Sequence, residues 1–400
     1  MNAKKISVSL LILFLLAISV RLGISLYLEK RIYFHDAVYH DRIAENIVRG
    51  NGAIASSNSV ALRMPGYPYI LSFFKNYSRG QEDYIVKVRL FQSFISALIV
   101  IPVFLILIRI VSPRLAWVGA LLLVFNPLQS VMSAFLLTEV MYSFALTMFI
   151  YSIILLTHQK HSHFFILSAL SLLIGVYMRE SMFHIIVFFV ILSISLKAFH
   201  SYRKIFIALC IITICGLIPW VMRNHAKLNT FVPFTTNEGF TLYDSLNPWA
   251  DGGTDVTKFL PQEKPEGLSE VEVNTYWKKK SFNEIRKDPL RIAYLAAKKF
   301  RKFWSITPNA NEFKTRKLLL IFRIFYIPLF IFLCVGLFSF VTRRSLKLSI
   351  VSIPILYSLL LHLMINGSLR YRMPLEPFII IIAVCGIETI LNIKNKVFSK

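Results

Sequence analysis

Residues 31–69 read RIYFHDAVYHDRIAENIVRGNGAIASSNSVALRMPGYPY and form the long polar break between the first apolar segment and the second. Tyr39, Ile43 and Ile47 recur every four residues, which predicts an amphipathic helix. Asp36 stands where an N-cap would lie, and Gly50 stands where the helix would end. The PGYP turn starts a second short helix. Both helices are too short and too polar to cross a bilayer, so we expect them at the membrane interface.

Apolar segments lie on both sides of this loop and decide the fold class. Hydrophobic residues make up 56% of the chain, and a helix that crosses a bilayer needs about 20 residues. The sequence therefore predicts an all-α polytopic membrane protein, a bundle of about ten transmembrane helices with a small outer polar region. The predicted spans are 6–27, 85–108, 115–136, 140–157, 164–178, 182–196, 205–222, 318–340, 348–365 and 378–393.

The basic excess suits a membrane protein better than a nucleic-acid-binding one. The chain has 45 Lys and Arg against 21 Asp and Glu, a formal net charge of +24. Because the chain is so hydrophobic, we expect these charges to anchor cytoplasmic loops and to line a site for an anionic partner, and we expect no nucleic acid. Membrane lipids are the expected surroundings.

Loop charges predict the topology. Lys4 and Lys5 precede a long apolar run without a small-residue cleavage site, which indicates a retained first span with a cytoplasmic N-terminus. Arg109 and Arg114, and later Lys197 and Lys204, then fall in short inside loops. Both termini are predicted to be cytoplasmic in the cell inner membrane. The predicted N-terminal transmembrane region is 1–222 and includes a first outer loop at 28–84. An outer polar region with a basic juxtamembrane helix follows at 223–317. A C-terminal transmembrane region follows at 318–400.

Cysteines and histidines give no strong sign of a metal. Cys210, Cys215, Cys334 and Cys385 all lie in apolar runs, where we expect small core residues rather than disulfides. The cluster of His35, Asp36, His40 and Asp41 is either a partial ligand set or a group of solvated side chains. The second interpretation is favoured because no matching cluster completes the set. No cofactor is predicted, and the involvement of a divalent metal stays open.

Two carboxylates are the candidate catalytic groups. Asp36 directly follows the first span and can act either as a base for an acceptor hydroxyl or as an N-cap. Glu139 lies in LLTEVMYSF, at a predicted outer end of a span. It is either a second acid that orients the acceptor or pairs with an arginine, or a charge at the start of a helix with Thr138 as its cap.

Arginines at predicted outer span ends are the candidate phosphate ligands. The planar guanidinium matches phosphate oxygens, whereas a single arginine at a span end often only snorkels. Arg370 and Arg372 stand two residues apart before Pro374, which predicts an extended segment with both side chains on one side. The complete substrate-binding set is Arg63, Tyr67, Arg179, Arg223, Arg370 and Arg372.

Taken in order, several motifs resemble the membrane glycosyltransferases of the GT-C fold. The branch is the bacterial one related to dolichyl-phosphate-mannose-protein mannosyltransferases and to the aminoarabinose transferase of lipid A. The motifs are FHDAVYHDRIAENIVRGNG, ALRMPGYPYIL, FNPLQSVMSAFLLTEVMYS, GVYMRESM, PWVMRNHAKLNTFVPFTTNEGFTLYDSLNP and RYRMPLEPF.

The resemblance implies a sugar donor on a polyprenyl phosphate and an active site on the outer side of the membrane. It also implies that Asp36 is the base or acceptor-orienting acid, that Glu139 is a second acid, and that Arg370 and Arg372 contact the lipid phosphate. Inversion at the anomeric carbon is favoured by the same analogy. Protein mannosyltransferases usually carry an Asp-Glu pair in the first loop, but here Ala37 follows Asp36. A glycan, a lipid and a protein therefore all stay open as acceptors.

Two other functions stay open. A surface-polysaccharide polymerase or ligase also has many spans and outer arginines. A non-enzymatic transporter of a lipid-linked sugar would show paired or broken spans in two similar halves. The favoured interpretation is a glycosyltransferase that moves a hexose or pentose.

Overall fold

The computed structural model describes residues 2–159, 161–254, 256–263, 265–308, 315–343 and 345–398. Residues 255, 264 and 309–314 of the predicted outer region lie outside this description. Within the described residues the fold is all α, with one isolated β-bridge between Ser56 and Ser59. The helices are α1 Ala3–Tyr27, α2 His35–Val48, α3 Gly66–Asn76, α4 Gln81–Leu98, α5 Val100–Leu107, α6 Pro113–Val124, α7 Pro127–Met132, α8 Glu139–His158, α9 Ser162–Met178, α10 Ser181–Ser195, η1 Lys197–Tyr202, α11 Arg203–Leu228, α12 Glu238–Leu246, α13 Leu260–Glu263, α14 Glu270–Lys287, α15 Pro289–Phe303, α16 Arg316–Arg343, α17 Leu346–Met364, α18 Leu369–Arg372, η3 Met373–Leu375 and α19 Glu376–Phe398.

The membrane-spanning helices largely match the predicted spans, with one correction. In the described part of the chain, seven helices are long and apolar enough to cross a bilayer, and three further apolar helices, α6, α9 and α10, are shorter. The predicted span 115–136 is wrong as one element. It is divided between α6 and α7 because Asn126 caps a new helix through its side chain and Pro127 occupies the first turn.

Two buried arginines stabilise helix ends inside the bundle. Arg21 of α1 donates to the carbonyls of Leu123 and Val124, where α6 ends. Arg89 of α4 donates to the carbonyls of Leu28 and Glu29, just beyond the end of α1. Terminal carbonyls of a helix have no partner within the helix and are costly to leave unpaired in an apolar surrounding. These two arginines therefore serve the fold.

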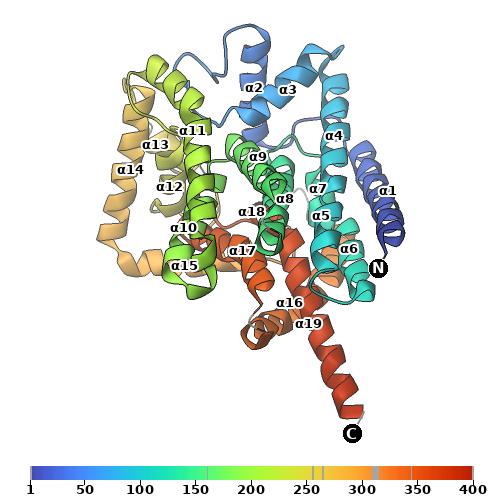
Figure 1. Cartoon of the computed structure of the whole chain (residues 1–400). Coiled ribbons are helices and arrows are strands. Elements are labelled where there is room, and N and C mark those ends of the chain that lie inside the picture. The colour runs from blue at the N-terminus through green and yellow to red at the C-terminus, as the bar shows by residue number, and fades with distance from the viewer. Residues whose placement is uncertain are drawn as a thin grey trace.

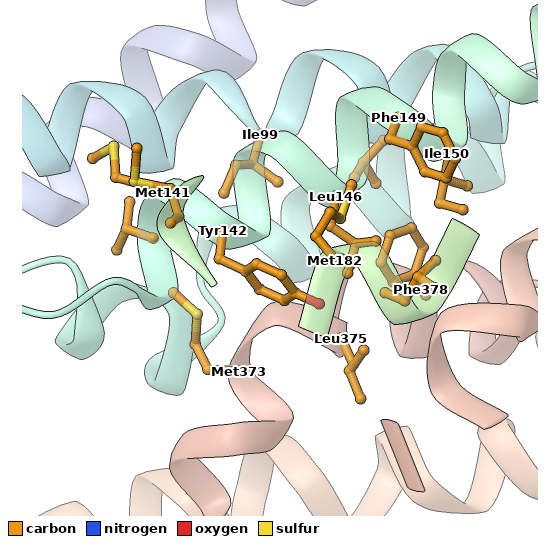
Figure 2. Close-up of a cluster of buried hydrophobic side chains, with 14 of the residues drawn as sticks. Ile99, Met141, Tyr142, Leu146, Phe149, Ile150, Met182, Met373, Leu375 and Phe378 are labelled. Carbon is orange, nitrogen blue, oxygen red and sulfur yellow. The ribbon is translucent and has the colours of Figure 1, made fainter. Parts of the chain in front are cut away.

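Helix α8 lies at the centre of the packing. Its side chains, among them Leu146 and Phe149, gather with Met182 of α10 and Phe378 of α19 in one buried cluster (Figure 2). This main core extends from Leu13 to Cys385, and a second, smaller cluster of Tyr243, Phe259 and Trp277 lies in the outer polar region. Cys385 lies in the main core, but Cys215 and Cys334 are exposed, so the prediction that all four cysteines are core residues is wrong for these two. Among the described residues, none of the four forms a disulfide.

The first outer loop contains the two predicted short helices, α2 and α3, which lie side by side at the top of Figure 1. The expected end of α2 is confirmed, since Gly50 follows it with φ +79°, a conformation that suits glycine. The expected cap is wrong. Phe34 is the N-cap residue and makes no side-chain cap bond, while Asp36 lies in the first turn of α2.

The outer region packs against this loop through a carboxylate that the sequence analysis did not single out. Glu270, in the first turn of α14, accepts hydrogen bonds from the backbone N–H groups of Val60 and Ala61 at 2.5 and 3.0 Å. It also accepts one from the hydroxyl of Thr236. Glu270 thus joins the segment that precedes Arg63 to the segment that precedes α12, and both segments face the cavity described next.

Candidate functional site

A cavity of about 920 Å³ opens between the first outer loop, the outer region and the ends of several spans. Its walls come from the start of α2, the 62–64 segment, α7, the corner between α9 and α10, the 235–244 segment, α16, the end of α17 and α18. One part of the wall is apolar, with Leu128, Val131, Met132, Leu318 and Phe322. Another part, which we call the polar lobe, contains Glu180, His184, Thr235, Asn237, Glu238, Thr241, Asp244, Tyr357 and Asn366.

Asp36 lies in the cavity wall between two arginines. Its Oδ1 accepts from Arg63 Nη2 at 2.8 Å, and its Oδ2 accepts from Arg370 Nη1 at 2.7 Å. The side chain keeps 33% of its surface exposed. Residues 334 positions apart in the sequence, Asp36 and Arg370, are thereby brought into direct contact. The fold therefore brings a charged residue of the first outer loop and one of the RYRMP segment together in one wall.

Glu139 contacts Arg370 as well and is fully buried. Its Oε1 accepts from Arg370 Nε at 2.5 Å and from Arg179 Nη1 at 3.3 Å. Arg370 therefore bridges two carboxylates. Thr138 is the N-cap residue of α8 but makes no side-chain cap bond, and Glu139 does not line the cavity. The geometry favours the interpretation that Glu139 pairs with arginines and orients them.

Electrostatics keep Asp36 ionised. Burial alone would raise its pKa, but the positive charges of Arg370 and Arg63 outweigh burial and hold the pKa of Asp36 well below its usual range. His40, one helical turn further along α2, also lines the cavity. Burial and the nearby charge of Arg63 lower the pKa of His40 to about 3, so its imidazole is neutral at pH 7.

Local features of the chain fix the position of Arg370. The Ser368 side chain accepts a hydrogen bond from the backbone N–H of Arg370 and starts the short helix α18. Gly367 lies against α15, where an added Cβ would be only 2.3 Å from the carbonyl oxygen of Lys299. Its backbone N–H also donates to the carbonyl of Gly252. The outer region therefore contacts the segment that immediately precedes Arg370 and fixes the position of Arg370 in the cavity wall.

Three predicted substrate-binding residues lie outside the cavity wall. Arg223 donates to the carbonyls of Ala53 and Val60 and so holds the first outer loop. Tyr67 is fully buried and donates to Gln92. Neither residue borders the cavity, whereas Arg63, Arg179 and Arg370 do.

Arg372 is the third residue outside the cavity, and its predicted geometry is wrong. The segment is helical, not extended, so side chains two residues apart point in nearly opposite directions. Arg372 is fully buried, pairs with Glu376 at 2.9 Å and donates to the carbonyls of Phe303 and Ser305. The sequence itself could have separated Arg372 from Arg370. Glu376 stands four residues after Arg372, a spacing that allows an ion pair on one helix face, whereas the residue four positions after Arg370 is Pro374, which has no charge.

The histidine and aspartate cluster of α2 is divided among different surroundings. His40 is buried, Asp41 pairs with Lys75 at 2.8 Å, and only Asp36 joins the arginines. The solvated interpretation is therefore wrong for His40 and Asp41. No group of three or more His, Cys, Asp or Glu that could hold a metal ion occurs in the part of the chain that the structure describes.

The polar lobe is the part of the site that sequence reasoning missed. Glu180 stands in the quoted GVYMRESM motif next to Arg179, but nothing in its spacing separates it from a surface carboxylate. Glu238, Asp244 and Asn366 come from segments far apart in the sequence, and only the folded chain brings them to one cavity.

Comparison with known proteins gives one family and several structures. The model of the dolichyl-phosphate-mannose-protein mannosyltransferase family matches residues 24–232. No curated protein matches the sequence. The apo oligosaccharyltransferase of Archaeoglobus fulgidus has a TM-score of 0.58 and 13% identity over 96% of this chain and 50% of its own.

Two further structures extend the comparison. AglB of Archaeoglobus fulgidus, in complex with an inhibitory peptide and a dolichol-phosphate, has a TM-score of 0.56 and 14% identity over 98% of this chain and 51% of its own. ArnT of Cupriavidus metallidurans, bound to undecaprenyl phosphate, has a TM-score of 0.49 and 13% identity over 97% of this chain and 78% of its own. The chain spans about half the length of the archaeal structures. At these identities the likeness to the archaeal proteins concerns the fold.

Proposed function

The chain belongs to the dolichyl-phosphate-mannose-protein mannosyltransferase family, and from this we propose that it transfers a hexose or pentose from a polyprenyl-phosphate donor to an acceptor at the outer face of the membrane. It is an integral membrane glycosyltransferase of the GT-C fold. The observation that carries the proposal is that Asp36 pairs with Arg63 and Arg370 in the wall of a cavity that has both apolar and polar lining residues. Arg179 lines the same cavity and shares Glu139 with Arg370.

A lipid-phosphate donor fits each part of this cavity. AglB binds a dolichol-phosphate in one of the archaeal structures, and we extend that class of ligand to this chain. The prenyl chain lies along the apolar wall of Leu128, Val131 and Phe322. The phosphate contacts Arg63 and Arg370, whose planar guanidinium groups match its oxygens.

The proposed step is a single displacement. Asp36 takes the proton of an acceptor hydroxyl, the acceptor oxygen bonds to the anomeric carbon, and the bond from that carbon to the phosphate oxygen breaks. The polyprenyl phosphate leaves with an added negative charge, which Arg63 and Arg370 stabilise. Attack from the face opposite the phosphate inverts the anomeric configuration. No cofactor is needed for this step, because the guanidinium groups supply the positive charge that the leaving group needs.

Donor binding prepares Asp36 for this role. In the free protein both Arg63 and Arg370 pair with Asp36 and make its carboxylate a weak base. A phosphate that binds the same arginines competes with the carboxylate for their positive charge. The pKa of Asp36 then rises toward the range in which a carboxylate accepts a proton. The base is therefore strengthened only when a donor is present.

The test uses a deletion strain complemented with the parent, with Asp36→Asn or with Asp41→Asn. Mass spectrometry of surface glycans should show the loss of one sugar mass in the deletion strain and its return with the parent. Asp36→Asn should cut transfer about 100-fold or more, because it removes the proton acceptor. Asp41→Asn is the matched control, since Asp41 lies on the same helix but pairs with Lys75 away from the cavity.

The same experiment separates the alternatives. Shortened glycan chains in the deletion strain, rather than the loss of one sugar, would indicate a polymerase. A transporter would keep its function with Asp36→Asn while losing it in the deletion strain. Unchanged glycans in the deletion strain would overturn the proposal.

A further inference from the structure

Glu180 is a half-buried carboxylate of the cavity wall that the proposed reaction does not use. It stands at the corner between α9 and α10, directly after Arg179. Its Oε2 accepts from the hydroxyl of Thr235 at 2.9 Å. Burial and the negative charge of Glu238 raise the pKa of Glu180. A carboxylate in this setting has acceptor capacity left for a ligand, because each of its two oxygens accepts more than one hydrogen bond.

Two further residues of the same polar lobe have buried polar atoms that find no partner among the residues that the structure describes. Tyr357 of α17 is only 9% exposed, and its hydroxyl has no partner among the described residues. Glu180 and Arg179 lie within electrostatic reach of this hydroxyl. Asn366 is 2% exposed and donates its amide N–H to Asp244, which leaves its Oδ1 unpaired within the described chain. Buried polar atoms are nearly always paired in folded proteins, so these two indicate where a polar ligand makes its bonds.

The charges of the lobe indicate what kind of ligand this is. Glu238 is already paired with Lys278 at 2.6 Å, and Arg63 and Arg179 lie close enough to Glu180 to lower its pKa in part. The charges of Glu180 and Glu238 are therefore partly compensated, and the lobe has many acceptors and hydroxyls. A neutral group with several hydroxyls fits such a wall, because each hydroxyl can donate to a carboxylate or amide oxygen and accept from a tyrosine hydroxyl.

We propose that Glu180 and the hydroxyl of Tyr357 bind hydroxyl groups of a neutral sugar ring and so determine which saccharide the enzyme accepts. This inference rests on the proposed function. The ring belongs either to the donor or to a saccharide acceptor, since both present the same hydroxyl groups to the lobe. Glu180 and Tyr357 act here as binding residues, whereas proton transfer stays with Asp36.

The test uses purified full-length protein and the lipid-linked donor fraction extracted from the deletion strain, in which the unused donor accumulates. Donor consumption is followed by mass spectrometry at varied donor and acceptor concentrations, and hydrolysis of the donor is followed without acceptor. Glu180→Gln should raise a KM by at least about tenfold, because it replaces a charged acceptor by a neutral amide. Tyr357→Phe keeps the ring and removes only a hydroxyl that has no partner in the described chain, so it should fold normally and raise the same KM.

The KM that changes identifies the source of the sugar ring. A higher donor KM in both transfer and hydrolysis assigns the lobe to the donor sugar, whereas a higher acceptor KM alone assigns it to the acceptor. Glu45→Gln is the control, because Glu45 pairs with Lys75 outside the cavity.

Failure of this inference is distinguishable from failure of the proposed function. Parental KM values in both Tyr357→Phe and a folded Glu180→Gln protein would overturn the sugar subsite while transfer itself stands. No donor consumption by the parent protein, together with unchanged glycans in the deletion strain, would instead overturn the proposed function.

Discussion

At the scale of single residues, the site depends on how arginines are shared between carboxylates. Arg370 bonds to Asp36 through Nη1 and to Glu139 through Nε, so two carboxylates fix the orientation of its planar guanidinium group. Arg179 adds a second contact to Glu139. A lysine could not replace this arrangement, because its ammonium group is a single point of charge and lacks the planar fork. The fully buried Glu139 thus orients the guanidinium groups that face the cavity.

The low pKa of Asp36 predicts a pH-dependent contribution to stability. A carboxyl whose pKa is lowered in the folded protein stabilises that state above its unfolded pKa of about 3.9, and this contribution is lost as the pH falls through the folded value. Arg63→Gln removes one of the two charges that lower the pKa. We therefore expect Arg63→Gln to lower the melting temperature in detergent most above about pH 5. The difference from the parent should narrow only as the pH falls through the raised Asp36 pKa of the variant toward the lower pKa of the parent.

The control is the double variant Arg63→Gln with Asp36→Asn, compared with Asp36→Asn alone. Without an ionisable group at position 36, the effect of Arg63→Gln should no longer vary with pH. A difference that stays constant with pH in the single variant would show that Arg63 stabilises the loop by packing and not through the charge of Asp36.

At the scale of elements, the contact between α15 and the start of α19 depends on a buried ion pair. Arg372 joins Glu376 of α19 to the carbonyls of Phe303 and Ser305 at the end of α15. Glu376 in turn accepts from Asn126, which caps α7. This network fixes α7, α15 and α19 relative to one another. Both α7 and the α18 segment before α19 contribute to the cavity wall, so the network positions the site without touching it.

Arg372→Met should therefore affect stability more than chemistry. Removing one partner of a buried ion pair leaves an uncompensated charge and costs about 3–5 kcal/mol. We expect a clear fall in the melting temperature of the detergent-purified protein, measured by tryptophan fluorescence. The protein that remains folded should keep its donor KM, because Arg372 does not line the cavity.

A second variant separates the ion pair from the size of the side chain. Arg372→Met combined with Glu376→Gln removes both charges and should recover part of the lost stability. If the double variant is no more stable than the single one, the carbonyl bonds of Arg372 contribute more than its pairing with Glu376.

At the scale of the whole molecule, the cavity shows that the first outer loop and the outer region lie on the same side of the membrane. Asp36 and Arg63 share its wall with Thr254 and Lys302, so both regions face the same side of the membrane. The two chain ends lie below α2 and α3 in the view of Figure 1. This arrangement agrees with the cytoplasmic termini and the outer active site that we propose for an inner-membrane protein, since loops rich in Lys and Arg stay inside.

Cysteine labelling tests this topology in the full chain. In a variant without the four native cysteines, Lys258→Cys should react with a membrane-impermeant maleimide added to intact cells. Lys204→Cys should react only after the membrane is opened, because it lies at the start of α11 in a predicted inside loop. Lysine is exposed at both positions, so access to the reagent depends on the side of the membrane. The reverse pattern would place the cavity in the cytoplasm and contradict an outer-face reaction.

Much of this protein could be predicted from its sequence alone. Long apolar runs fix the all-α membrane class, because a chain in lipid must pair its backbone groups within helices. The spacing of Tyr39, Ile43 and Ile47 predicted α2, and Asp36 stood out because it directly follows the first span. These features are local: they depend on a repeat, a cap or a run of residues that can be read in order. The sequence also identified Glu139 and the outer arginines as candidates, because a charged side chain near the hydrocarbon is costly unless it has a partner or faces water.

The tertiary structure decided which of these residues share a site. Arg370 faces the cavity, whereas Arg372 faces Glu376, because a step of two residues along a helix rotates the side-chain direction by roughly 200°. Arg223 and Tyr67 are equally prominent in the sequence but bond to the backbone and to Gln92. Glu180, Tyr357 and Asn366 meet only after the chain closes on itself. No local pattern encodes such meetings, because packing between distant helices, and not sequence spacing, sets the directions in which side chains point.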